Sequence, residues 1–85
     1  MDESPLTFPC DYPIKVMGPH TPEFRAAVLA VLTAEAGGAE PRITERLSRE
    51  GAYVSLTCTV RVASRAQLDG LYRRLHATGV VRYAL

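Results

Sequence analysis

The stretch from Gly51 to Ala63 constrains the fold more than any other part of the chain, because apolar and polar residues alternate along it. The apolar positions are Val54, Leu56, Cys58, Val60 and Val62, and the positions between them are Tyr53, Ser55, Thr57, Thr59 and Arg61. A period of two residues is typical of a β-strand that buries one face only. The sequence therefore predicts a long strand in a sheet whose second face is left to solvent or to a partner.

Two segments with a helical period can cover the buried face of that strand. The first begins with Thr21 as N-cap and Pro22 at the first helical position, and Gly37-Gly38 is expected to end it. Its apolar stripe consists of Phe24, Ala27, Val28, Val31 and Leu32.

The second helical segment begins at Ser64, which forms a capping box with Gln67, and ends at Gly79. Its apolar positions are Leu68, Leu71, Tyr72 and Leu75, and Gly70 is interpreted as permitting close packing on the sheet.

Three shorter alternating segments, 12–17, 42–48 and 80–85, complete the predicted sheet. Gly51 supplies the positive φ of a tight hairpin between the second and third strands. Residues 1–11 are predicted to be an irregular lead-in, and 12–85 a single domain. The element order predicts an α+β, ferredoxin-like βαββαβ fold: a four-stranded antiparallel sheet with two helices on one face and the first and third strands in the centre.

Composition and charge narrow the classes of function. The 85 residues suffice for one domain, and a net charge of +1 gives no basic footprint, so a nucleic-acid partner is not expected. The longest apolar run, 26–32, is too short to cross a bilayer, and Asp2 and Glu3 do not resemble a signal region, so we expect a cytoplasmic protein. Cys10 and Cys58 have no neighbours at metal-ligand spacing, and neither a metal nor another cofactor is predicted.

The two cysteines are expected to differ. Cys58 lies on the apolar side of its strand and is interpreted as a small buried hydrophobe. Cys10 stands in a proline-flanked segment that can be exposed, so a reactive thiol is an alternative to a merely structural residue there.

Catalysis has no support in the sequence. His20 and His76 are far apart in the chain and have no carboxylate at a useful spacing, and the Ser and Thr residues of the third strand have no neighbouring base. Tyr53 is the one aromatic residue expected on the polar face of the third strand, which does not match an RNA-stacking pattern. We therefore predict a protein that is not an enzyme.

Several short motifs resemble the YbeD-like family of small bacterial proteins. They are Phe8-Pro9, Tyr12-x-x-Lys15-Val16-Met17-Gly18, Ser48-x-x-Gly51-x-Tyr53-x-Ser55, Leu71-Tyr72-x-x-Leu75 and Val81-Arg82-x-x-Leu85. The resemblance runs from Phe8 to Leu85, and the Lys-Val-Met-Gly run is its most specific part. It implies a ferredoxin-like fold similar to the ACT regulatory domains, no assigned activity, and a regulatory link with lipoyl transfer.

The first candidate site is the polar face of the sheet. Its predicted contact residues for an unknown protein partner are Lys15, Tyr53, Ser55 and Arg61. A merely solvated face is an equal alternative. The first hypothesis is therefore a small regulatory or adaptor protein that acts by protein–protein interaction.

The second candidate site is the loop of Gly18, His20 and Thr21 before the first helix. The N-terminus of a helix can hold an anion or a carboxylate. Similarity to ACT domains implies an effector site at this loop between two copies of the chain, whereas the simpler reading is a turn with a helix cap. The alternative hypothesis is therefore a homodimeric sensor of a small metabolite.

Overall fold

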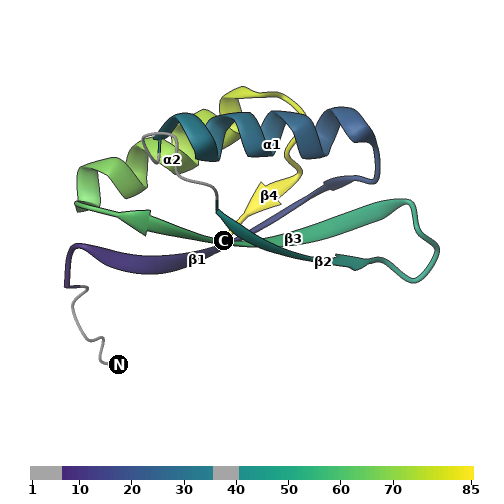
Figure 1. The fold of residues 1–85 in the computed structure, drawn as a ribbon. Helices are drawn as coiled ribbons and strands as arrows, with labels where there is room; N and C mark the ends of the chain where they lie inside the picture. The colour runs from purple at the N-terminus through teal and green to yellow at the C-terminus, as the bar shows by residue number, and fades with distance from the viewer. Residues whose placement is uncertain (1–6, 36–40) are drawn as a thin grey trace.

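The computed structural model describes residues 7–35 and 41–85 and has the predicted element order (Figure 1). The elements are β1 (Cys10–Pro19), α1 (Pro22–Glu35), β2 (Arg42–Leu47), β3 (Tyr53–Val62), α2 (Arg65–Ala77) and β4 (Tyr83–Ala84). The strands form one antiparallel sheet in the order β2-β3-β1-β4, so β1 and β3 are central. The ferredoxin-like fold class is confirmed. The predicted helix end at Gly37-Gly38 lies outside the described residues.

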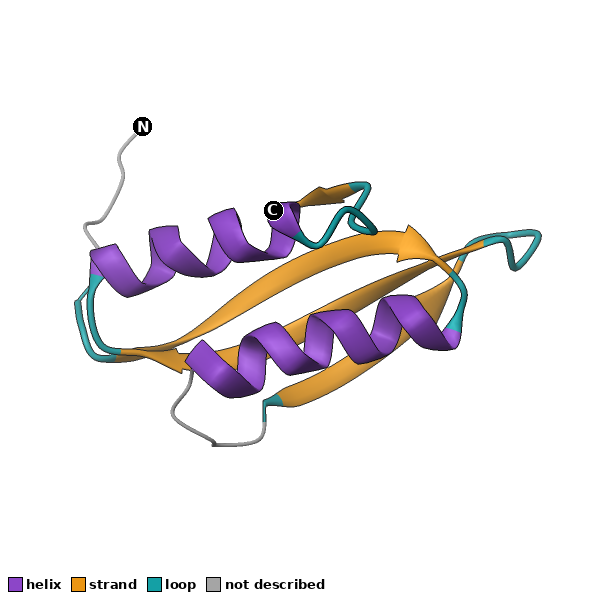
Figure 2. Cartoon of the chain, turned by 90° about the horizontal axis from the view of Figure 1, so that it is seen from above, coloured by secondary structure: helices purple, strands orange, loops and turns teal. Residues whose placement is uncertain are grey.

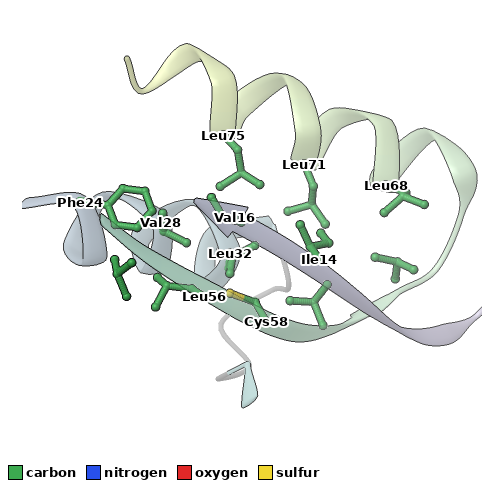
Figure 3. Packing of buried hydrophobic residues seen from close by; sticks show 13 residues of the cluster. Ile14, Val16, Phe24, Val28, Leu32, Leu56, Cys58, Leu68, Leu71 and Leu75 are labelled. Atoms are coloured by element: carbon green, nitrogen blue, oxygen red, sulfur yellow. The ribbon is translucent and has the colours of Figure 1, made fainter. Parts of the chain in front are cut away.

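Both helices cover the same face of the sheet and run roughly along the strands (Figure 2). Their buried leucines and Phe24 point onto the alternating apolar positions of β1 and β3 (Figure 3). The buried core consists of Ile14, Val16, Phe24, Val28, Leu32, Val54, Leu56, Cys58, Val60, Val62, Leu68, Leu71 and Leu75. The period-two and helical patterns thus meet in one apolar layer.

Strand β1 is longer than predicted, and the last strand is shorter. All ten residues from Cys10 to Pro19 pair with β3, which adds two residues at each end of the predicted 12–17. Gly18 and Pro19 therefore belong to the strand and not to the loop. In the predicted 80–85 segment only Tyr83–Ala84 is strand, although Leu85 still exchanges two backbone hydrogen bonds with Lys15, of 2.8 and 3.1 Å.

The helix cap predicted at Ser64 is present, but the reciprocal bond of the predicted capping box is made by the backbone N–H of Ala63 and not by that of Ser64. The backbone N–H of Gln67 donates to Ser64 Oγ at 3.1 Å, as expected for a helix cap. Gln67 Oε1 accepts from the backbone N–H of Ala63, and Gln67 Nε2 donates to the carbonyl of Glu35, the last residue of α1. One glutamine thus joins the end of α1 to the start of α2.

Glycines with positive φ stand in the β2–β3 turn and after the end of α2, as predicted. Gly51 and Gly79 have φ of +79° and +80°, a region that favours glycine. The interpretation of Gly70 was wrong, because a Cβ there would meet Arg73 Nη2 at 3.8 Å and no sheet atom of the described residues within 4 Å. Gly70 therefore does not bring α2 closer to the sheet. Neither described helix is long and apolar enough to cross a membrane.

Candidate functional site

The sheet surface opposite the two helices is here called the open face (Figure 1). The strand register assigns to it Asp11, Pro13, Lys15, Met17 and Pro19 of β1, Arg42, Thr44 and Arg46 of β2, Tyr53, Ser55, Thr57, Thr59 and Arg61 of β3, and Tyr83 of β4. Neither α1 nor α2 covers this surface. The predicted assignment of residues to the two faces agrees with the register.

The predicted contact residues do not form one cluster. Tyr53 stands at the first position of β3 and Arg61 eight positions later, so they are roughly 26 Å apart. Lys15 pairs with Thr57 between them. Arg61 also has a partner within the fold, because its Nη1 lies 3.3 Å from Asp11 Oδ1 in an exposed cross-strand pair. Tyr53 and Ser55 remain together at one end of the face.

Tyr53 takes part in a cluster that the sequence analysis did not identify as a site. The cluster lines a hollow of about 370 Å³ with Met17, Tyr53, Arg82 and Tyr83, here called the Tyr53 hollow. Arg82 Nη2 donates to Tyr53 Oη at 3.2 Å, and the guanidinium carbon lies 4.9 Å from the centre of the Tyr53 ring. The cation–π contact and the hydrogen bond hold the ring and the guanidinium together.

A local irregularity of the backbone explains why Arg82 was missed. Alternation along a regular strand would place Arg82 and Tyr83 on opposite faces. However, the backbone N–H of Arg82 donates to the carbonyl of Met17 at 2.7 Å, while the register pairs Tyr83 with the same residue. Two residues thus oppose one, as in a β-bulge, and both side chains line the hollow. The family motif contains Arg82, but its side-chain position depends on this contact.

The residues of the predicted effector loop separate into two groups. Gly18 is buried in β1, and a Cβ there would overlap with the Phe24 ring. His20 and Thr21 border a second hollow of about 200 Å³, here called the His20 hollow. Its lining residues are His20, Thr21, Pro22, Arg25, Val54 and Leu56.

Both polar residues of the loop already have partners. Thr21 Oγ1 accepts from the backbone N–H of Phe24 at 3.1 Å, as an N-cap does. The backbone N–H of His20 donates to the carbonyl of Ala52 at 3.0 Å, and His20 Nδ1 lies 3.3 Å from the carbonyl of Gly51. The loop is therefore joined to the β2–β3 hairpin.

Two groups of the described residues have perturbed pKa values, and neither of them lines a hollow. Burial raises the pKa of the Cys58 thiol to about 11. Burial and the neighbouring Tyr12 hydroxyl raise the pKa of Tyr72 to about 12. Cys10 is half-buried at the start of β1. In residues 7–35 and 41–85, His, Cys, Asp and Glu do not gather in groups of three suited to a metal ion.

Comparison with known proteins identifies the family. The family model described as "Protein of unknown function (DUF493)" matches residues 3–85. A UPF0250 protein of Nitrosomonas europaea is 46% identical over 76 residues, which cover 88% of this chain and 87% of that protein. A UPF0250 protein of Bordetella pertussis is 45% identical over 85 residues, which cover 99% of this chain and 93% of that protein.

A solved structure supports the fold assignment independently. The solution structure of protein HP0495 from H. pylori has a TM-score of 0.82 and covers 98% of this chain and 88% of that one. Its sequence identity is 12%, so the likeness concerns the fold alone. The resemblance drawn from the motifs is confirmed by the sequence matches: the chain belongs to the DUF493 (UPF0250, YbeD-like) family.

Proposed function

We propose that the chain is a regulatory or adaptor module that binds another protein through its open face and performs no catalysis. The observation that carries this proposal is the group of large apolar side chains exposed there. Tyr53 and Tyr83 are 37% and 44% exposed on this face. Leu85 is 68% exposed and lies opposite Lys15. Aromatic and arginine side chains at the centre of an interface carry much of its binding energy.

The arrangement at the Tyr53 hollow supports binding more than chemistry. The side chains around it supply a thioether, two phenols and a guanidinium. A nucleophile with a base beside it, or a pair of carboxylates, is not among them. The rigid tyrosine rings bury a large area at a small cost in side-chain entropy. These properties favour recognition of a protruding side chain of a partner.

Affinity capture with matched variants tests this proposal. Tagged wild type, Tyr53→Ala/Tyr83→Ala, and an Arg73→Ala/His76→Ala control on the exposed side of α2 are compared in the cytosol of the source organism. The expected result is a protein captured by wild type and control that is lost with the tyrosine variant, and that binds again when both proteins are purified. Equal capture by all three chains, each with an unchanged circular dichroism spectrum, would contradict the proposal.

The His20 hollow favours a second candidate function, a sensor that binds a small metabolite as a dimer. The hollow lies at the N-terminus of α1, where the helix dipole attracts a carboxylate, and it is lined by His20 and Arg25. Light scattering and thermal unfolding with amino acids and lipoate as probes test it. A dimer whose melting temperature rises with one of these acids, and does not rise in His20→Ala, is expected. A monomer with no shift contradicts this function.

A further inference from the structure

The charges of the molecule are distributed unequally between the two sides of the sheet. The cations on the open face are Lys15, Arg42, Arg46 and Arg61, and Arg82 joins them at the Tyr53 hollow. The one described side-chain carboxylate that the register assigns to it is that of Asp11, which pairs with Arg61. The remaining ion pairs of the described residues, Arg25–Glu45 and Arg74–Glu35, lie on the helical side. A chain of net charge +1 therefore presents a strongly basic face.

Four of these cations are not neutralised by a carboxylate of residues 7–35 and 41–85. Lys15, Arg42, Arg46 and Arg82 are exposed and form no ion pair with a carboxylate of the described residues. Like charges gathered on one surface repel each other and raise the local concentration of opposite charge. A partner with carboxylates facing this surface removes the repulsion.

Starting from the proposed function, we infer that the partner of the open face is an acidic protein segment that inserts an aromatic or branched apolar side chain into the Tyr53 hollow. The hollow has about 370 Å³ and apolar walls from Met17 and the two tyrosines. Arg82 borders the hollow on the β4 side. Arg46 lies on β2, two strands away from Met17, so the two cations flank the inserted side chain. With strands about 4.8 Å apart, the cations span roughly 14 Å across the sheet, a distance that a few extended residues cover.

Nucleic acid fits this face less well than an acidic protein segment. Single-stranded RNA on a sheet of this topology stacks its bases on aromatic residues of the central strands. Here the middle of the face carries Ser55, Thr57 and Thr59, and the aromatic rings stand together at one corner. A single hollow surrounded by cations fits a partner segment that has one apolar side chain between carboxylates.

The inference is tested by NMR titration of the isotope-labelled full chain with three synthetic probes. The first is a short peptide of glutamates around a central phenylalanine, the second has alanine for that phenylalanine, and the third is a single-stranded RNA of similar charge. The variants are Arg46→Gln/Arg82→Gln and Lys15→Gln/Arg46→Gln; the latter keeps the Arg82–Tyr53 contact intact. The matched control, Arg65→Gln/Arg73→Gln, removes the same charge from exposed positions of α2.

The expected result is that the phenylalanine peptide shifts the amide signals of Met17, Tyr53 and Tyr83. Each open-face variant should weaken this binding at least about tenfold, the control less than about twofold, and added salt should weaken it as well. The inference is overturned by equal losses in variants and control, by equal affinity for the alanine peptide, or by tighter binding of the RNA. If the peptide does not bind while the tyrosine variant still loses its captured protein, the acidic-partner inference fails and the proposed function stands.

Discussion

At the scale of single residues, Gly18 shows how a motif residue can serve packing. It is the glycine of the Lys-Val-Met-Gly run, and its missing side chain leaves the space that the buried Phe24 ring occupies. We expect Gly18→Ala to lower the free energy of unfolding by about 1–3 kcal/mol, because an added methyl group forces the ring or β1 to shift. Urea unfolding at equilibrium measures this. Unchanged stability would mean that the ring relocates without cost.

Gly70 is a control for Gly18, because we expect an alanine at this position to stabilise the fold. It lies inside α2, and a Cβ added there has ordinary room beside Arg73. Since alanine loses less backbone entropy than glycine in a helix, we expect Gly70→Ala to raise the free energy of unfolding by about 0.5–1 kcal/mol. The same urea titration compares it with Gly18→Ala. A loss of stability in Gly70→Ala would show that this position contacts something beyond its own helix.

At the scale of elements, the last strand depends on few bonds and can be examined by truncation. Leu85 exchanges two backbone hydrogen bonds with Lys15, of 2.8 and 3.1 Å, and Tyr83 pairs with Met17. Deleting residues 83–85 should lower the free energy of unfolding by at least about 2 kcal/mol, at about 1 kcal/mol for each backbone bond to Lys15, because the pairing of Tyr83 with Met17 is lost as well. The control Leu85→Ala keeps the backbone and removes an exposed side chain, so it should change stability by less than about 0.5 kcal/mol. Thermal unfolding of both chains decides whether the backbone or the side chain matters.

The elements that the sequence predicted well are those with a strong period or a specific cap. The alternation of β3 and the Ser64–Gln67 cap are local properties, so the sequence contained them. The C-terminal end of β1 was harder to predict from the sequence, because glycine and proline usually end strands. Here Gly18 and Pro19 stay in the strand because they pair with β3. Only tertiary contacts extend the strand over them.

The sequence was sufficient to predict which face of the sheet carries the proposed contact residues, but not how they are arranged on that face. The face of Lys15, Tyr53, Ser55 and Arg61 follows from alternation, and the register agrees with it. Two facts required the structure: Arg61 lies at the far end in a pair with Asp11, and Arg82 reaches Tyr53 across β1 because of the bulge opposite Met17. Neither the distance along a strand between partners nor an irregular backbone contact has a local sequence signal.

At the scale of the whole molecule, burial of titratable groups in the single apolar layer makes the stability fall as the pH rises in the alkaline range. The Cys58 thiol is fully buried and has its pKa raised from 9.0 to about 11, and the pKa of Tyr72 rises from 10.0 to about 12. Between pH 9 and 11 the folded thiol keeps a proton that the unfolded thiol has lost. The unfolded state then binds fewer protons, so the free energy of unfolding falls as the pH rises.

The contribution of Cys58 can be separated from that of Tyr72 by substitution. For one thiol the slope is at most about 1.4 kcal/mol per pH unit, so urea unfolding of the wild type from pH 8 to 11 should show a falling stability. Cys58→Ala removes the titrating group and should give a shallower slope from pH 9 upward, although its stability at pH 8 is lower because a small cavity remains. Tyr72→Phe should be shallower only above pH 10. Equal slopes in wild type and Cys58→Ala would mean that the thiol ionises in the folded chain as easily as in the unfolded one, and that the core beneath β3 admits water.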